Sequence, residues 1–367
     1  MAKNLGGNLC YCDAKVKAYT GAGLEPKTRG KYGPEKLKGM AMAKTAFVTG
    51  GTGFVGLNLI DELIKQGWSV TALHRPSSDL TYLGRFKVDL VVGEVTDPAS
   101  LLAAIPTGTD TVFHVAGNTN MWRQGNAEQT RDNVEGTHNV VEAAIAKSVR
   151  RLVVTSSISA YGDVSGAVTE ETPSQAAHSW VNYEKTKYQA QEVARAAMAR
   201  GLEVVVMQPG GIIGPWDIGT WSRMFQMVRD DKLPGVPPAS LSFGHVTEVV
   251  KAHIVAAERG ENGGNYLLAG TDATMLDLVS AIARLIGKPV PTKTISPVLL
   301  GIVARVGDIV STFTKKAPSF TPEMAEGLGG SVTVSSAKAI KQLGYKTVPL
   351  EVMVKDCHDW MVAEGRI

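Results

Sequence analysis

The chain has few cysteines and no long hydrophobic run, and each absence excludes a class of protein. Only three of its 367 residues are cysteines, Cys10, Cys12 and Cys357, too few for a disulfide framework or a four-thiolate zinc site. The longest apolar run, residues 297–304, is far shorter than the roughly 20 residues that span a bilayer. We therefore expect a protein of a reducing cytoplasm with no membrane span.

The net charge of +3 comes from one end of the chain. Residues 1–41 contain eight Lys and Arg against three acidic residues, so the remainder has a net charge of −2. The main part therefore lacks the basic surface of a nucleic-acid-binding protein. The seven histidines have no metal-ligand spacing, and we predict no metal site. Residues 1–41 also lack helical or strand periodicity, which favours a disordered extension, with Met42 as an alternative start of the protein.

A glycine pattern dominates the remaining sequence. Gly50, Gly53 and Gly56 follow an apolar strand at 45–49 and open an amphipathic helix at about 54–66. This spacing is the dinucleotide-binding fingerprint, in which a pyrophosphate lies against free N–H groups at the positive end of a helix. A glycine loop without a ligand is the alternative, but the strand before the loop and the helix after it favour nucleotide binding.

Strand and helix patterns alternate after this turn. We predict further strands at 69–73, 88–92, 111–115, 151–155, 203–208 and 265–268, and helices at 98–105, 127–147, 181–200, 247–259, 274–286, 297–313, 335–343 and 349–364. The alternation predicts an α/β fold, a doubly wound parallel Rossmann sheet with a smaller C-terminal substrate-binding lobe. The nucleotide-binding domain is expected at 42–215, completed by about 240–269, and the lobe at 216–239 and 270–367.

The end of the second strand carries information on the cofactor. An acidic residue at this place binds the ribose 2′-hydroxyl of NAD, but here the chain reads His74-Arg75. An arginine can pair with a 2′-phosphate, which favours NADP over NAD. The alternative is a solvated arginine at a strand end.

A serine, a tyrosine and a lysine provide the candidate chemistry. Ser157 follows the strand at 151–155, and Tyr183 and Lys187 are four residues apart in a helical pattern, so they share one helix face. A nearby ammonium stabilises a phenolate, so Tyr183 could exchange a proton with a carbonyl or an alcohol while the serine hydroxyl polarises the same oxygen. The tyrosine and lysine alone could equally be a partly buried phenol beside a surface amine.

The order of these motifs resembles the extended short-chain dehydrogenase/reductase family, within the NAD-dependent epimerase/dehydratase group. Its dihydroflavonol reductase-like branch, related to cinnamoyl-CoA reductases and 3β-hydroxysteroid dehydrogenases, is the most similar. Residues 112–117, 133–137, 208–215 and 343–345 also match this pattern. Homodimers are common among its members, so the resemblance allows a homodimer.

The resemblance implies a role for each matching residue. Tyr183 is the general acid and base, Lys187 lowers its pKa and holds the nicotinamide ribose, and Ser157 orients the carbonyl. The cofactor would contact Gly50, Thr52, Gly53, Phe54, Val55, Arg75, Glu94, Val95, Val115, Ala116, Gly117, Pro209, Gly210, Gly211 and Ile212. Glu94 stands where the family commonly has aspartate. Asn133 could support a water relay or pack within its helix.

The sequence indicates the class of the substrate but not its identity. Asn118, Trp122, Trp180, Trp216 and Trp221 fall where the family has substrate-contacting loops, which indicates a bulky apolar or aromatic small molecule, although packing within the lobe would explain each of them. For the 297–313 segment, a helix packed on the lobe is favoured over a membrane-surface helix. The sequence thus predicts an NADP(H)-dependent carbonyl reductase or alcohol dehydrogenase. The alternatives are a nucleotide-sugar epimerase or dehydratase that retains NAD, and a non-catalytic NADP-sensing protein.

Overall fold

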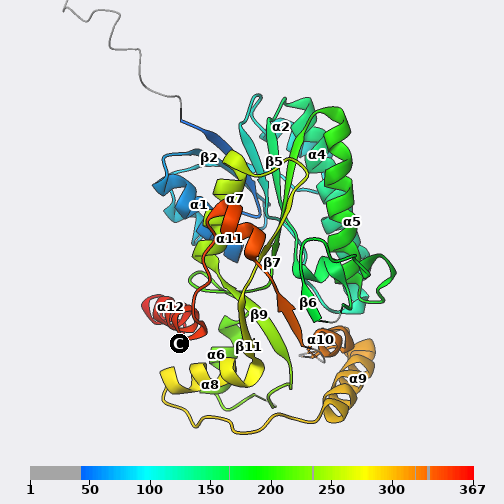
Figure 1. The fold of residues 1–367 in the computed structure, drawn as a ribbon, viewed down its shortest axis with the longest axis vertical. Helices are drawn as coiled ribbons and strands as arrows, with labels where there is room; N and C mark the ends of the chain where they lie inside the picture. Colours follow the sequence, from blue (N-terminus) through cyan, green and yellow to red (C-terminus); the bar gives the residue numbers. More distant parts are fainter. Residues whose placement is uncertain (1–42, 165, 234, 319, 329–330) are drawn as a thin grey trace, which may run out of the picture. The chain divides into compact units, whose positions relative to one another are not determined.

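A seven-stranded parallel sheet is the centre of the fold (Figure 1). The computed structural model describes residues 43–164, 166–233, 235–318, 320–328 and 331–367, so the predictions for residues 1–41 lie outside the described residues. The strands follow the order β10-β7-β5-β4-β1-β2-β3. Their bounds are β1 (Thr45–Thr49), β2 (Ser69–His74), β3 (Asp89–Val92), β4 (Thr111–His114), β5 (Arg151–Thr155), β7 (Glu203–Pro209) and β10 (Asn265–Leu268).

Helices cover both faces of this sheet because its inner strands are apolar on both sides. In β1, Ala46 and Val48 face a core formed with α1 (Phe54–Lys65) and α7 (Val246–Arg259). Phe47 points to the opposite core, which is formed with α2 (Pro98–Ala104), α4 (Gly136–Ala146) and α5 (Asn182–Ala196). All three strand residues are almost completely buried. This arrangement confirms the predicted doubly wound Rossmann sheet.

The chain reverses direction across the sheet between β1 and β4. From β1 it continues to β2 on one side, whereas β4 lies on the other side of β1. Ligands of open α/β sheets bind outside the carboxyl ends of the strands at such a point. The ends of β1, β4 and β5 therefore define the edge of the sheet at which a site is expected.

A second group of elements has its own apolar core. It unites α6 (Ser222–Arg229), α8 (Met275–Leu285) and α12 (Leu350–Ala363). A three-stranded sheet β11-β9-β8 joins this core to the central sheet. Its strands are β8 (Gly211–Ile213), β9 (Ser240–His245) and β11 (Thr271–Thr274), and a two-stranded sheet pairs β6 (Gly166–Val168) with β12 (Val332–Val334).

Three helices complete the second half of the chain. Helices α9 (Pro297–Thr314) and α10 (Pro322–Gly327) pack against each other. In contrast, α11 (Ala337–Leu343) lies against α7 and β10, so this part of the predicted lobe packs on the central domain. The division of the chain at residues 215 and 270 stays a prediction.

The predicted elements agree with the observed ones to within a few residues, with two exceptions. The helix predicted at 127–147 is interrupted: α3 (Asn126–Thr130) passes into a π-helical turn at Arg131–Glu135 before α4 begins. The helix predicted at 181–200 ends as α5 at Ala196 and continues as a 3-10 turn, Ala197–Arg200. Other 3-10 turns are Leu83–Arg85, Arg123–Gly125, Ile158–Tyr161 and Ala176–His178.

Candidate active site

The glycine turn between β1 and α1 is packed too tightly for larger residues. Gly50 has a φ of +73°, and a Cβ atom there would lie 2.6 Å from the amide nitrogen of Ala116. A Cβ atom on Gly56 would overlap the carbonyl oxygen of Gly50. Both glycines are therefore required by the close approach of the turn, the next strand end and the helix.

The N-terminus of α1 faces outward from this turn without a side-chain cap. Gly53 is the N-cap residue, and the first turn contains no acidic residue. Phe54 and Val55 open the helix, so their N–H groups have no partner within it. Such groups at the positive end of a helix suit an anion, so the predicted contact with a pyrophosphate fits this geometry and stays a prediction. Thr52 lies in the turn, partly exposed.

The predicted adenosine contacts lie beside this turn, at the ends of β2 and β3. Arg75 is exposed, and its backbone is held by a hydrogen bond of 3.1 Å from its amide nitrogen to Ser78 Oγ. Glu94 is also exposed, while the Val95 carbonyl accepts a hydrogen bond of 3.0 Å from Asn139 Nδ2. The guanidinium is thus available at the end of β2, where a 2′-phosphate would be expected.

The segment after β4 connects the turn with the candidate catalytic residues. The amide of Ala116 donates a hydrogen bond of 3.2 Å to Thr49 Oγ1 at the end of β1. Val115 is partly buried and Gly117 is exposed. A Cβ atom on Gly117 would lie 3.1 Å from Lys187 Nζ, so a larger residue here would press on the amine. This strand end therefore borders both the nucleotide turn and the lysine.

Ser157, Tyr183 and Lys187 come together at the same edge. Ser157 lies beyond the end of β5 in an extended conformation, and its hydroxyl accepts a hydrogen bond of 3.1 Å from the Ser159 amide. Tyr183 and Lys187 lie one turn apart on α5, and the amine is 5.9 Å from the centre of the phenol ring. The amine donates a hydrogen bond of 3.1 Å to the carbonyl oxygen of Thr155, the last residue of β5.

Burial changes the acidity of both groups on α5. It lowers the pKa of the Lys187 amine to about 8 and raises the pKa of the Tyr183 phenol above its ordinary value. The nearby Ser157 hydroxyl lowers the pKa of Tyr183, but by less than burial raises it. The phenol is therefore protonated at neutral pH, and the predicted lowering of its pKa by Lys187 stays a prediction.

Asn133 fixes the π-helical turn to the strand end after β4. Its side-chain oxygen accepts a hydrogen bond of 2.7 Å from the Asn118 amide, and its nitrogen donates to the Asn118 carbonyl at 3.0 Å and to Thr186 Oγ1 at 3.1 Å. The extra residue of a π turn allows such a side chain to point into a site. A void of about 10 Å³ borders Asn133 and Lys187, close to the volume that one water requires.

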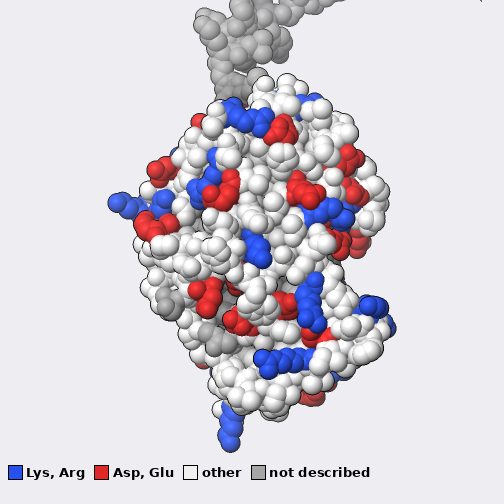
Figure 2. All heavy atoms as spheres, turned by 90° about the vertical axis from the view of Figure 1, so that its right-hand side faces the viewer, with Lys and Arg blue, Asp and Glu red and all other residues white. Residues whose placement is uncertain are grey.

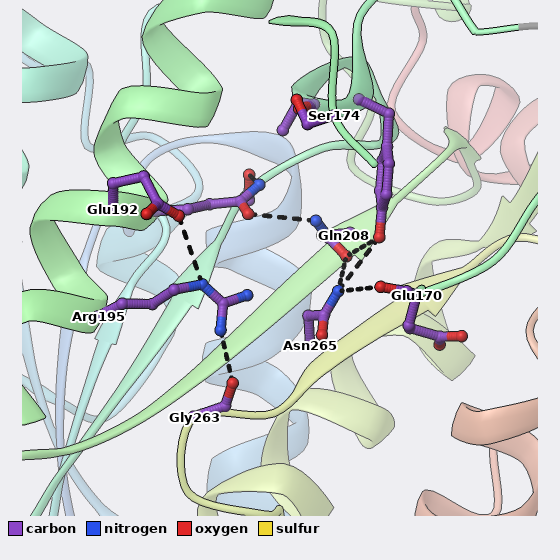
Figure 3. A network of polar contacts seen from close by, with 11 residues as sticks. Glu170, Ser174, Glu192, Arg195, Gln208, Gly263 and Asn265 are labelled. Carbon is purple, nitrogen blue, oxygen red and sulfur yellow. Dashed lines mark hydrogen bonds and ion pairs between the residues drawn. The ribbon is translucent and has the colours of Figure 1, made fainter. Parts of the chain in front are cut away.

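A buried polar network lies behind the serine strand, and it was not predicted from the sequence (Figure 3). Gln191 Nε2 donates to Ser156 Oγ at 2.6 Å, and Gln208 Nε2 donates to Gln191 Oε1 at 3.3 Å. Gln208 Oε1 then accepts from the Tyr161 hydroxyl at 3.1 Å and from Asn265 Nδ2 at 3.2 Å. The network ties α5 to β5, β7 and β10. One signal was present in the sequence: residue 191 follows residues 183 and 187 at the same four-residue spacing.

The predicted nicotinamide segment lies where β7 leaves the sheet. Pro209 is buried, Gly210, Gly211 and Ile212 are partly exposed, and β8 begins at Gly211. A Cβ atom on Gly210 would collide with the carbonyl of Ser242 in β9. The chain at Gly210 passes so close to β9 that only glycine fits at this position.

Two predicted substrate residues lie near helix α9. The Trp122 indole donates a hydrogen bond of 3.2 Å to Ser311 Oγ, and Trp180, 55% exposed, lines a pocket of about 270 Å³ between α9 and α10. The remaining lining residues are Pro238, Pro297, Leu300, Gly301, Ala304, Arg305, Pro322, Ala325, Glu326 and Leu328. The Asn118 side chain donates to Asp132 Oδ2 at 3.0 Å.

The other two tryptophans pack elsewhere, so the four do not converge on one cleft. Trp216 stacks edge-on against Tyr82 with ring centres 5.3 Å apart and also contacts Trp360 of α12. Trp221 packs against Phe243 of β9 at 5.4 Å. Trp221 packs against the second core and Trp216 against the core formed with α1 and α7, as the packing alternative predicts.

Buried histidines have structural partners. His114 Nδ1 is 2.8 Å from Thr49 Oγ1 and its Nε2 is 3.0 Å from Thr137 Oγ1, while burial lowers its pKa to about 3. His253 contacts Thr155 Oγ1 at 3.1 Å. Within the described ranges, no group of three or more His, Cys, Asp or Glu side chains is arranged to hold a metal ion.

Comparison with known proteins identifies the family. The model of the NAD dependent epimerase/dehydratase family matches residues 46–269. The chain belongs to this family. The membership confirms the predicted resemblance to extended short-chain dehydrogenases/reductases and accounts for the glycine turn and the fold around it.

Several of its similar relatives are reductases and dehydrogenases by name. A Synechocystis sp. protein with the provisional name dihydroflavonol 4-reductase is 29% identical over 337 residues, 89% of this chain and 97% of the relative. A 3-beta-hydroxysteroid dehydrogenase of Mycolicibacterium neoaurum is 28% identical over 347 residues, 87% of this chain and 93% of the relative. The crystal structure of gox2253 superposes with a TM-score of 0.76 at 30% identity, covering 88% of this chain and 99% of that one. The chain is accordingly an NAD(P)-dependent oxidoreductase of the extended type.

Proposed function

We propose that the protein reduces a carbonyl group of a bulky apolar or aromatic small molecule with NADPH, or oxidises the corresponding alcohol with NADP. The observation that carries this proposal is the approach of Ser157, Tyr183 and Lys187 at the sheet edge that also holds the glycine turn. A bound reduced nicotinamide supplies the hydride, and the protein contributes orientation and a proton.

The acidity of the two α5 residues suits the reductive direction. A phenol whose pKa is raised by burial stays protonated, so Tyr183 can donate its proton to the carbonyl oxygen as the hydride arrives. The Ser157 hydroxyl would donate a hydrogen bond to the same oxygen and polarise it. The Lys187 ammonium would stabilise the phenolate that proton donation leaves behind.

The preference for NADP rests on Arg75. A guanidinium can form a bidentate, charge-assisted pair with a phosphate, whereas an acidic residue at this position would repel it. Arg75 is exposed at the end of β2, beside the anion-binding turn at α1. This position supports a contact with a 2′-phosphate.

The substrate class rests on the pocket between α9 and α10. Its wall includes Trp180, three residues before Tyr183, and most of the other lining side chains are apolar. Arg305 and Glu326 are its charged members. Such a lining favours a bulky apolar molecule with few polar groups.

A carbonyl-reduction assay tests the proposal. The purified chain is incubated with NADPH and a panel of bulky aliphatic and aromatic aldehydes and ketones, and NADPH consumption and alcohol formation are measured. We expect turnover of at least one carbonyl, with NADPH preferred over NADH. NADP binding without turnover of any carbonyl would contradict the proposal and favour a non-catalytic NADP-sensing protein.

A nucleotide-sugar epimerase or dehydratase remains the second candidate, because the matching family is described by those activities. Enzymes of this kind retain NAD during the reaction. Mass spectrometry of ligands released from the purified chain separates the two candidates: bound NAD and conversion of a nucleotide sugar would support the second.

A further inference from the structure

Helix α9 has one face that packs on the protein. Its buried residues are Leu300, Ala304, Asp308 and Ser311. Asp308 forms an ion pair of 2.8 Å with Arg123, and Ser311 accepts the hydrogen bond from the Trp122 indole. These contacts fix α9 to the segment that follows β4.

The opposite face of α9 is apolar and exposed. Its large side chains include Ile302, Val303, Val306, Ile309, Val310 and Phe313, with exposed fractions from 45% to 83%. With 3.6 residues per turn, these six positions fall within an arc of about 120°. Within the described part of the chain, α9 is the one helix that is long and apolar enough to cross a membrane, judged by length and composition. Only 22% of it is buried in the protein.

The exposed charges of α9 and the segments that flank it have one sign, and Glu326 of α10 is an acidic neighbour of Arg305. The segment 288–318 contains five Lys and Arg residues, and its single acidic residue, Asp308, is buried and paired. Lys315 and Lys316 directly follow the helix and are exposed, as is Arg305. Figure 2 shows the side of the molecule on which α9 lies: its lower part is mostly white, with basic side chains crossing it and projecting from its edge, and acidic side chains at its upper border and lower rim.

We propose that α9 docks in the plane of an anionic lipid bilayer. The apolar face would enter the boundary between headgroups and acyl chains, and Lys315, Lys316 and Arg305 would contact the headgroup phosphates. A spanning orientation does not fit, because it would remove Asp308 and Ser311 from Arg123 and Trp122. The sequence favours a helix packed on the lobe, and this describes only one face of α9. The other face is exposed to solvent.

A second copy of the chain fits this face less well than a bilayer. An 18-residue helix is about 27 Å long, and a face about 10 Å wide covers roughly 300 Å². Stable dimers bury about 800 Å² on each partner. Two α9 helices alone would therefore leave a dimer well short of that area, whereas a lipid surface has no such limit.

Vesicle co-sedimentation of the purified full chain tests the proposal. The vesicles are phosphatidylcholine alone, or phosphatidylcholine with about one third phosphatidylglycerol. We expect binding to the anionic vesicles, weaker binding at high salt, and an at least tenfold lower partition coefficient for Ile309→Ser/Phe313→Ser. Lys315→Glu/Lys316→Glu should also weaken binding. Val352→Ser/Val362→Ser, which alters exposed valines of α12, is the matched control and should bind as the unaltered chain does.

Each other outcome would overturn the proposal. Residues 1–41 carry eight Lys and Arg residues of their own, so binding that survives both α9 variants would belong to another part of the chain. Absence of binding to either vesicle would also refute it. If light scattering showed a dimer that Ile309→Ser/Phe313→Ser converts to a monomer, without vesicle binding, the face would be a subunit interface instead. Circular dichroism of each variant establishes that it is folded.

Discussion

The strands of the central sheet, at whose carboxyl edge the site lies, and the outer face of α9 are both apolar, but they use apolar side chains in opposite ways. Phe113 of β4 is 0% exposed, whereas Phe313 of α9 is 83% exposed. Burying such a side chain stabilises a fold by about 1.5–3 kcal/mol, so β4 gains stability from its apolar residues and the outer face of α9 gains almost none. Substitutions at the edge should alter folding or catalysis, and those on the outer face should alter association alone.

The largest effect is expected at the phenol of the site. Tyr183→Phe removes the proposed proton donor and leaves the ring, so kcat for carbonyl reduction should fall by about 10²–10⁴-fold. Tyr188→Phe removes a partly exposed phenol of the same helix, about 140° around it from Tyr183, and should leave kcat unchanged. Similar losses in both variants would show that α5 tolerates neither change, and full activity of Tyr183→Phe would exclude this residue as the proton donor.

The packing of the glycine turn should be nearly as sensitive. In Gly56→Ala the new Cβ overlaps the carbonyl of Gly50, and neither backbone can move away freely. Overpacking of this kind costs about 1–3 kcal/mol, which urea unfolding would measure as a lower free energy of unfolding. Gly84→Ala is the matched control, because its Cβ meets nothing within 4 Å. Equal stability of the two variants would mean that the turn is not tightly packed.

A smaller effect, confined to the cofactor, is expected at Arg75. Arg75→Glu replaces a cation by an anion and should raise KM for NADPH by about 10–100-fold, since a charge-assisted hydrogen bond contributes about 1.5–3 kcal/mol. KM for NADH should change little, because NADH lacks the 2′-phosphate. Arg223→Glu alters another exposed arginine and serves as the control. An equal rise of KM for NADPH and NADH would show that Arg75 does not contact the 2′-phosphate.

The pH dependence distinguishes the two groups on α5. Lys187, with a pKa lowered to about 8, is charged below that pH and neutral above it. Because the ammonium stabilises the phenolate formed in reduction, kcat/KM should fall as the pH rises through about 8. Tyr183, with a raised pKa, remains protonated there, and His114, with a pKa of about 3, is already neutral. Lys187→Met should be less active and lack this decline; a decline that persists would have another origin.

Features that depend on local sequence patterns could be predicted from the sequence. The sheet and the glycine turn were predictable because their patterns are local: runs such as residues 203–208 are buried on both faces, and Gly50 and Gly56 are required by sterics. The spacing of Tyr183 and Lys187 likewise places both on one helix face. The position of Ser157 beside them follows from the crossover between β5 and its parallel neighbour β7: Ser157 follows the carboxyl end of β5, and α5 begins at the same edge of the sheet.

Features that depend on distant partners were not predictable. Strand β8 has only three residues and pairs with β9. The other neighbour of β9 is β11, which lies about sixty residues after β8 in the sequence. The π-helical turn at Asn133 depends on contacts with Asn118 and Thr186 that the sequence does not reveal. For the same reason, the tryptophans could be assigned to loops but not to a shared cleft.

The smallest effect on folding is expected on the outer face of α9. Phe313→Ser alters a side chain that is already 83% exposed, so the free energy of unfolding should change by less than about 0.5 kcal/mol. Leu300→Ser, on the inner face of the same helix at 6% exposure, should cost markedly more, because it places a hydroxyl where an apolar side chain is packed. Urea unfolding of both variants measures the difference. A loss above 1 kcal/mol for Phe313→Ser would mean that this face is covered by another part of the chain, and the contrast between α9 and the sheet edge would then fail.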